Sequence, residues 1–257
     1  MDKAPITSTI RSEKESGTAT GVASGVGSVR EELFQHLVQY VSNAGLRGDY
    51  VETGVHNGAS AVAVGRAMQC LNMTESGRRL WLYDSWEGFP QTTAQADGVW
   101  ATRSVAGGAN GTNWGAPKGP RPATMENVQQ GLRNVGVDLE RAVVFRKGWF
   151  DKTFAMEKPE RVAFLHVDGD LYRSVKDTLV NFYDLVVPGG VILFDDYGYF
   201  EGCRTAFYEF LVEERREYPL LERHGNTQAW FIKGKEHNRG RASIAYTKRL
   251  DACDGHS

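Results

Sequence analysis

The sequence predicts an α/β protein whose sheet is mostly parallel and ends in an antiparallel hairpin. Short apolar runs of strand length alternate with segments of helical periodicity, which is typical of parallel sheets covered by helices. Two of these runs, at 162–167 and 191–194, are followed directly by acidic clusters, and a helix-length segment from Ser174 to Leu185 lies between them. Because a strand, a helix and a second strand form a crossover unit, both acidic clusters should meet at the carboxyl edge of one sheet.

The other elements follow the same alternation. Apolar residues at helical spacing predict a first helix from Val29 to Ala44. The sequence Pro188-Gly189-Gly190 is expected to close the helix between the two acidic strands. Ahead of the acidic strands, the patterns predict strands at 49–53, 80–83 and 142–146 and helices at 59–68 and 125–135.

The end of the alternating pattern carries a hairpin signal. After the second acidic cluster we expect a helix around Arg204 to Glu217, and then strands at 220–223 and 228–233. The Gly225-Asn226 pair between these strands favours a tight turn. Five strands that alternate with helices and are followed by a hairpin resemble the class I methyltransferase fold, which is Rossmann-like. A dinucleotide-binding dehydrogenase would more often continue with parallel strands.

Length and composition favour one large domain with additions. The chain has 257 residues and a formal net charge of −2, which suits a single α/β domain over 29–234. Residues 1–28 are rich in Ser, Thr, Gly and Ala, and we expect a mobile arm or a lid. The long polar stretch 91–122 is expected to be a substrate loop or lid. Residues 235–257 form a polar C-terminal tail to which the sequence gives no clear role.

The composition disfavours several classes of partner. A near-neutral charge without a long basic run argues against nucleic acid. The sequence has no apolar run of bilayer length and no charged-then-apolar leader at its start, so we expect a cytoplasmic protein without a membrane partner. The three cysteines, Cys70, Cys203 and Cys253, lack metal spacing and are expected to be free thiols in a reducing compartment. We also expect a homo-oligomer.

A Gly-rich turn joins the first predicted strand to its helix. In this turn Gly54 would let a ligand approach the backbone, and Gly58 would let the helix start close to the strand. The turn does not have the G-x-G-x-x-G pattern, which weakens a dinucleotide interpretation. Glu52 stands where an acid can hold the ammonium group of an amino-acid ligand, and Asp84 ends the next strand, where a carboxylate can accept ribose hydroxyls. These features favour S-adenosylmethionine over a purely structural turn.

The two acidic clusters predict a metal site. Asp168 and Asp170 follow one strand, and Asp195 and Asp196 follow the other. Four carboxylates at one strand edge repel each other unless a cation joins them, and oxygen-only ligands favour a hard ion such as magnesium. A turn at Gly169 would let one acid bind metal while the other faces a substrate. The alternatives are that Asp170 caps the following helix and that the second pair caps a loop.

These residues lie in five stretches that follow one another along the chain: Asp49-Tyr50-Val51-Glu52-Thr53-Gly54-Val55, Asp84-Ser85-Trp86-Glu87-Gly88-Phe89-Pro90, Lys147-Gly148-Trp149-Phe150-Asp151-Lys152-Thr153, His166-Val167-Asp168-Gly169-Asp170-Leu171-Tyr172-Arg173-Ser174 and Phe194-Asp195-Asp196-Tyr197-Gly198. In this order, over about 29–234, they resemble the macrocin O-methyltransferase (TylF) family. The family consists of S-adenosylmethionine- and magnesium-dependent enzymes that methylate sugar hydroxyls of antibiotics and other glycosylated natural products.

The resemblance implies roles for individual residues. Asp170 matches the family's general base. In the first turn Thr53 replaces a common Cys, and His56-Asn57 replaces a bulky residue followed by a basic one. The positions matching the metal ligands are Asp168, Asp195 and Asp196. The expected cofactor contacts are Glu52, Thr53, Gly54, Ser60, Asp84, Ser85, Gly148, Trp149, Phe150 and Asp168.

Other readings of the same residues stay open. A catechol-type O-methyltransferase shares the fold, cofactor and metal, but takes a flat aromatic diol; the long 91–122 stretch favours a bulkier acceptor. A cofactor-binding scaffold without catalysis has no need of four clustered carboxylates. His166 lies inside a strand and receives no chemical role. The residues for which a ligand contact and ordinary packing are both open are His56, Trp86, Trp100, Trp114, Trp149, Phe150, Tyr172 and Tyr197.

Overall fold

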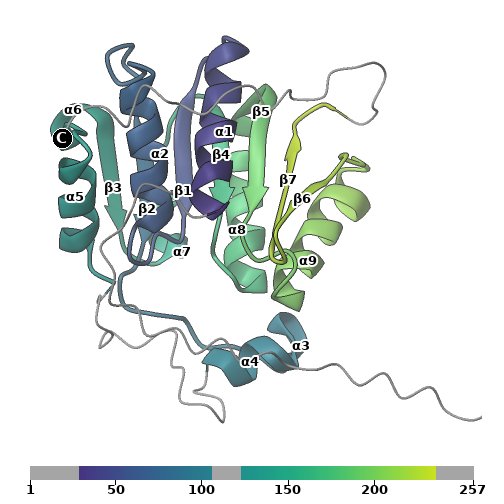
Figure 1. The fold of residues 1–257 in the computed structure, drawn as a ribbon. Helices are drawn as coiled ribbons and strands as arrows, with labels where there is room; N and C mark the ends of the chain where they lie inside the picture. Colours follow the sequence, from purple (N-terminus) through teal and green to yellow (C-terminus); the bar gives the residue numbers. More distant parts are fainter. Residues whose placement is uncertain (1–28, 106–122, 236–257) are drawn as a thin grey trace, which may run out of the picture.

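In the computed structural model, residues 29–105 and 123–235 are described, and they form three layers (Figure 1). A seven-stranded sheet in the order β3-β2-β1-β4-β5-β7-β6 forms the middle layer. Strands β1 to β5 run parallel, and β7 and β6 add an antiparallel hairpin at one edge. The strands span Asp49–Thr53 (β1), Leu80–Asp84 (β2), Val143–Lys147 (β3), Val162–Val167 (β4), Val186–Phe194 (β5), Glu222–His224 (β6) and Gln228–Ile232 (β7).

Helices cover both faces of the sheet. Figure 1 shows α1, α2 and α5 on the near face, and α7 and α8 behind it, while α3 and α4 lie beyond the lower edge. A 3₁₀ turn at Tyr183–Leu185 follows α8, and a π-helical segment at Tyr208–Glu214 follows α9. The helices span Val29–Asn43 (α1), Ala59–Cys70 (α2), Ala94–Asp97 (α3), Val99–Val105 (α4), Met125–Asn134 (α5), Leu139–Ala142 (α6), Phe150–Thr153 (α7), Tyr172–Phe182 (α8) and Glu201–Phe207 (α9).

Two apolar cores form on the two faces of the sheet. Helices α1, α2 and α5 bury Leu37, Val64 and Leu132 on one face, and α8 and α9 bury Leu179 and Phe207 on the other. Strand β4 is buried along its whole length, because it lies at the centre of the sheet with helices on both sides. The fold is therefore the class I S-adenosylmethionine-dependent methyltransferase fold that the alternating pattern predicted. The buried central strands therefore fix the positions of the residues that follow their carboxyl ends.

The structure corrects two expectations, those for 188–190 and for Cys70. The sequence Pro188-Gly189-Gly190 lies inside β5 rather than closing α8, and the β4–β5 register shifts there, so the strand starts earlier than its apolar run. The described part of the 91–122 stretch folds into α3 and α4. Among the cysteines, Cys203 is buried and free as expected, but Cys70 is disulfide-bonded. The expectations for 1–28, 236–257 and Trp114 fall outside the described residues.

Gly54 shows how closely the central strands approach one another. Its φ is +89°, and a Cβ there would clash with the carbonyl group of Asp168. The missing side chain thus allows the close contact between the β1 and β4 ends. We expect Gly54→Ala to lower the free energy of unfolding by at least ~2 kcal/mol, from strained backbone plus overpacking. Gly77→Ala is the matched control, because Gly77 has φ +82° and open space around it. Equal losses in denaturant unfolding would contradict the steric explanation.

Candidate active site

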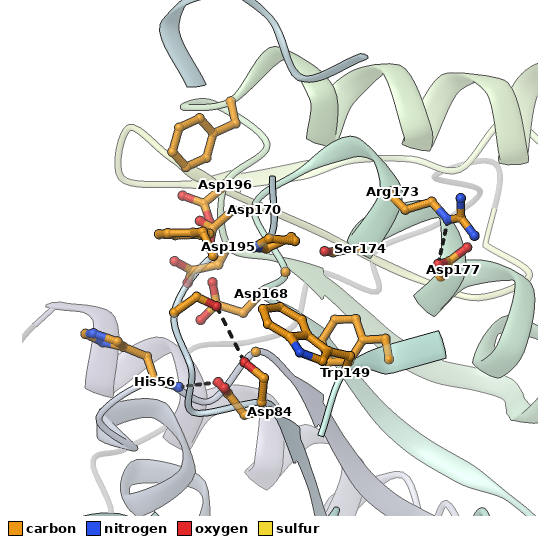
Figure 2. Close-up of a pocket in the computed structure, with 18 of the residues that line it drawn as sticks. His56, Asp84, Trp149, Asp168, Asp170, Arg173, Ser174, Asp177, Asp195 and Asp196 are labelled. Atoms are coloured by element: carbon orange, nitrogen blue, oxygen red, sulfur yellow. Dashed lines mark hydrogen bonds and ion pairs between the residues drawn. The ribbon is translucent and has the colours of Figure 1, made fainter. Parts of the chain in front are cut away.

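A cavity of about 610 Å³ opens at the carboxyl ends of the central strands. It lies at the point where the strand order reverses between β1 and β4, the usual ligand position in such sheets. Figure 2 shows the carboxylates of Asp168, Asp170, Asp195 and Asp196 gathered together in it, with Trp149 beside them. The structure therefore brings together the acidic residues that the sequence placed at two neighbouring strand ends.

Three of these carboxylates form a compact oxygen cluster. One carboxylate oxygen from each of Asp168, Asp195 and Asp196 lies within 4.8 Å of the others. Burial, followed by the negative charge of Asp195, raises the pKa of Asp168 well above its usual value. Burial also raises the pKa of Asp196. A divalent cation would offset this repulsion, and oxygen donors at this spacing suit a hard ion such as Mg²⁺. The residues therefore fit the metal that the family resemblance implied.

Asp170 is held differently from its neighbours. Its φ is +59°, and the amide of Leu171 donates to the carbonyl oxygen of Gly169 at 2.6 Å across it, as in a γ-turn centred on Asp170. The chain therefore turns at Asp170 itself, one residue later than expected. The N-cap position of α8 is Leu171, so Asp170 lies one residue outside it and does not occupy the cap position that the alternative interpretation required. The turn directs this carboxylate toward Asp196, and burial with the nearby charge of Asp196 raises its pKa well above the usual value.

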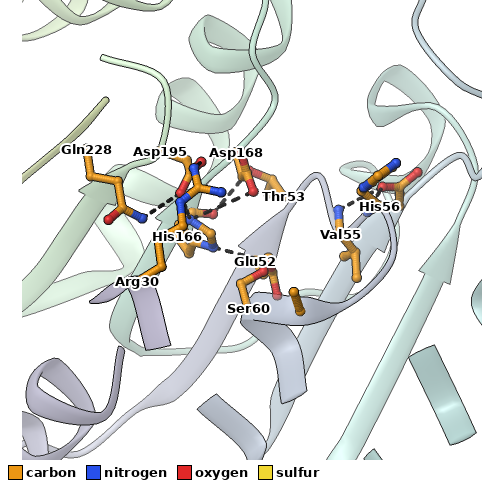
Figure 3. A network of polar contacts seen from close by, with 12 residues as sticks. Arg30, Glu52, Thr53, Val55, His56, Ser60, His166, Asp168, Asp195 and Gln228 are labelled. Atoms are coloured by element: carbon orange, nitrogen blue, oxygen red, sulfur yellow. Dashed lines mark hydrogen bonds and ion pairs between the residues drawn. The ribbon is translucent and has the colours of Figure 1, made fainter. Parts of the chain in front are cut away.

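His166 links the acidic cluster to the first strand. The parallel register pairs it with Glu52, whose Oε1 lies 3.3 Å from Nδ1, while Nε2 lies 3.5 Å from Asp195 Oδ1 and 4.0 Å from Asp168 Oδ2 (Figure 3). Burial lowers the pKa of His166, but hydrogen bonds with Asp195 and Glu52 outweigh it and raise the pKa to about 10. The His166 ring therefore stands behind the carboxylates, between Glu52 and Asp195. His166 is buried and hydrogen-bonded, and no chemical role is assigned to it.

Two further groups bind Asp195. Gln228 Nε2, from the hairpin strand β7, donates to Asp195 Oδ1 at 2.7 Å. Arg30, from the first turn of α1, donates to Asp195 Oδ2. Burial alone would raise the pKa of Asp195, but the hydrogen bond with His166 and the charge of Arg30 outweigh it, so that pKa is lowered. The hairpin and the first helix thus fix one carboxylate of the cluster.

Asp84 holds the Gly-rich turn in place. Its Oδ2 accepts from the amides of Val55 at 2.7 Å and His56 at 2.8 Å, and its Oδ1 accepts from the amide of Trp86 at 2.6 Å. The indole N–H of Trp86 donates back to the carbonyl oxygen of His56 at 3.1 Å. Trp86 is thus a structural part of the turn and packs on Phe145. Asp84 and His56 both line the cavity.

The other predicted cofactor residues divide into two groups. Those that line the cavity with Asp84 are Gly54, Ser85, Gly148, Trp149, Phe150 and Asp168. The remaining three predicted residues, Glu52, Thr53 and Ser60, do not line the cavity in the part of the chain that the structure describes. Glu52 is 2% exposed and accepts a hydrogen bond from Ser60, and Thr53 donates to the carbonyl oxygen of His166 at 3.4 Å. They stand behind the wall of the cavity and support it.

The aromatic candidates also divide. Tyr172 donates to Glu209 at 2.5 Å, and Tyr197 donates to Tyr208 at 3.1 Å; neither of these described residues lines the cavity. Trp149 is 37% exposed at the cavity wall. Among the lining residues that lie outside both the named candidates and the quoted stretches are Arg30 from α1, Asp177 from α8, Tyr199 and Phe200 from the loop after β5, and Thr227 from the turn before β7.

The fold and this site together define a class of protein, the class I methyltransferases. The profile of the family described as Macrocin-O-methyltransferase (TylF) matches residues 8–232. The chain belongs to this family and is an O-methyltransferase. No described helix is long and apolar enough to pass through a bilayer.

Individual relatives agree with the family. The chain is 30% identical over 205 residues to the 8-demethyl-8-(2,3-dimethoxy-alpha-L-rhamnosyl)-tetracenomycin-C 4'-O-methyltransferase of Streptomyces olivaceus, covering 80% of this chain and 74% of the relative. It is 29% identical over 185 residues to the Mycinamicin III 3''-O-methyltransferase of Micromonospora griseorubida, covering 72% and 68%. The solved structure of the O-methyltransferase NovP superposes with a TM-score of 0.66 at 27% identity and covers 80% of each chain.

Proposed function

We propose that this protein transfers a methyl group from S-adenosylmethionine to a sugar hydroxyl of a glycosylated natural product in antibiotic biosynthesis, with a divalent metal ion, Mg²⁺, at the acidic cluster. The observation that supports this most is that the four carboxylates fall into two sets: an oxygen cluster of Asp168, Asp195 and Asp196, and the separately turned Asp170. The names of the two relatives supply the acceptor class, because each specifies an O-methylation position on a glycosylated antibiotic.

The proposed roles follow the geometry of the cavity. A bound metal ion would supply Lewis-acid chemistry, which lowers the pKa of a hydroxyl. Asp168, Asp195 and Asp196 would hold it, and the contacts of Asp195 with Arg30 and Gln228 orient one of these ligands. A methyl donor bound along Gly54, Asp84 and the 148–150 turn would supply an electrophilic methyl group.

Asp170 would accept the proton that the sugar hydroxyl loses as its oxygen is methylated. The remaining task of the chain is to align the hydroxyl with the methyl group, since orientation carries much of the rate in such transfers. Aromatic side chains such as Tyr199 and Phe200 at the cavity wall would shield the reacting groups from water. We further propose that the 91–122 stretch contributes to acceptor binding and that the enzyme is a homo-oligomer.

An acceptor panel tests the proposed function. Methyl transfer from labelled S-adenosylmethionine should be measured with mycinamicin III, with a rhamnosylated tetracenomycin and with a simple catechol. We expect label in a methyl ether on the sugar of at least one glycoside and none on the catechol. Label on the catechol alone would favour the aromatic-diol alternative and overturn the sugar assignment.

Asp84 should be required for cofactor binding. Loss of charge-assisted hydrogen bonds to ribose hydroxyls is expected to weaken the affinity of Asp84→Ala for S-adenosylhomocysteine by roughly 10–100-fold in calorimetry. Because Asp84 also holds the turn through backbone amides, Trp86→Phe is the control: it removes the indole bond to the turn and leaves the carboxylate. An equal loss in both variants would assign the effect to the turn rather than to a ribose contact.

A further inference from the structure

The turn that carries Asp170 needs an anchor on its far side. A positive φ at a residue other than glycine and a γ-turn bond are both costly, and such backbone persists only where its surroundings fix it. On the near side the turn continues from the buried strand β4. On the far side it enters α8, whose N-cap residue, Leu171, offers no side-chain cap.

Asp97 supplies that anchor from another part of the chain. Its Oδ1 accepts from the amide of Tyr172, the first residue of α8, at 3.0 Å, and its Oδ2 accepts from the amide of Thr93 at 2.9 Å. Asp97 is 5% exposed and has no cationic partner among residues 29–105 and 123–235, which is unusual for an aspartate and indicates that both carboxylate oxygens are committed to these bonds. One buried carboxylate therefore ties α3 to the start of α8, two residues after Asp170.

The packing around Asp97 makes this tie rigid. A Cβ on Gly202, in the first turn of α9, would come within 2.8 Å of the Tyr172 amide nitrogen and 3.0 Å of the Asp97 Cα. The backbones of α3, α8 and α9 therefore meet without intervening side chains. Since α9 begins shortly after Asp196, the junction touches both loops that carry the acidic residues.

We propose that Asp97 is a positioning residue that couples the segment α3–α4 to the Asp170 turn. The inference rests on the proposed function, in which Asp170 is the base. Displacement of α3 would remove the bond to the Tyr172 amide, relax the turn and move the Asp170 carboxylate away from the acceptor hydroxyl.

Amide hydrogen exchange of the S-adenosylhomocysteine-bound protein tests the anchor directly. We expect the Tyr172 amide to exchange at least tenfold faster in Asp97→Ala than in the wild type. Thr93→Ala is the matched control, because Thr93 caps α3 through its side chain, while its backbone amide still reaches Asp97. It should leave exchange at Tyr172 unchanged. Wild-type exchange in Asp97→Ala would overturn the proposal. Asp97→Asn, which keeps the volume and one acceptor, serves if the alanine variant does not fold.

Turnover with a glycoside from the acceptor panel tests whether the anchor acts through Asp170. Asp97→Asn should lower kcat by roughly 10–100-fold, as expected for a misplaced catalytic group, with unchanged affinity for S-adenosylhomocysteine. In an Asp170→Asn background the same change should have almost no further effect. Additive losses would assign Asp97 a general structural role. If Asp170→Asn alone keeps full turnover, the base assignment fails, and the exchange rates still decide whether Asp97 anchors the turn.

Discussion

Asp170→Asn should lower kcat by about 10²–10⁴-fold, the usual contribution of a positioned general base. Asparagine keeps the size of the side chain and, like aspartate, tolerates a positive φ, so the γ-turn at this position should survive. Only the basic carboxylate is removed. The affinity for S-adenosylhomocysteine should therefore stay nearly unchanged, and the loss should appear in kcat rather than in cofactor binding.

The cavity offers a matched control for this variant. Asp177 also lines it, but it pairs with Arg173 at 2.8 Å, away from the oxygen cluster (Figure 2). Asp177→Asn should change kcat by less than about threefold, because it removes an exposed ion pair of little energetic value. Wild-type turnover in Asp170→Asn would mean that water, and not Asp170, takes the proton. Equal losses of kcat in Asp170→Asn and Asp177→Asn would mean that the variants act through the total negative charge of the cavity.

Removal of divalent metal should reduce methyl transfer by at least ~10²-fold, since Lewis-acid stabilisation of the reacting oxygen supplies several kcal/mol. Dialysis against a chelator and re-addition of Mg²⁺ should abolish and then restore turnover. Asp196→Asn should require more metal for half-maximal activity, because it removes one oxygen ligand of the cluster.

Tyr197→Phe is the control for the metal-ligand variant. Tyr197 follows the acidic pair directly, but it does not line the cavity in the described part of the chain, and its hydroxyl contacts Tyr208. The metal concentration that Tyr197→Phe needs for half-maximal activity should match that of the wild type. Full activity after exhaustive chelation would exclude a role for the metal in catalysis and leave the acidic cluster without its proposed function.

The sequence was sufficient to predict the sheet and the proximity of the two acidic clusters. Strand β4 is an uninterrupted apolar run, and a parallel crossover to β5 leaves Asp168 and Asp195 at adjacent strand ends. The hairpin was predictable as well, because Gly225, with φ +57°, stands between two short strands. These elements follow from local patterns of a few residues.

The rest depends on register and on contacts between distant segments. The contact of His166 with Glu52 follows from the pairing of β1 with β4, which no local pattern encodes. The same holds for Arg30, which reaches Asp195 from a helix at the other end of the sequence. The buried Asp97 lies in a stretch that looked like a polar loop, and its partner, the Tyr172 amide, is 75 residues further along the chain.

The central claim is that Asp168, Asp195 and Asp196 bind the metal ion while Asp170 acts as the base. A measurement of metal binding to the protein itself tests this claim most directly. The S-adenosylhomocysteine-bound wild type, Asp170→Asn and Asp195→Asn should each be titrated with manganese in a calorimeter, and the three affinities should be compared. We expect Asp170→Asn to bind manganese with wild-type affinity and Asp195→Asn to lose at least about tenfold, since Asp195 belongs to the oxygen cluster. Loss of metal affinity in Asp170→Asn, with wild-type affinity in Asp195→Asn, would show that the two roles are assigned to the wrong residues.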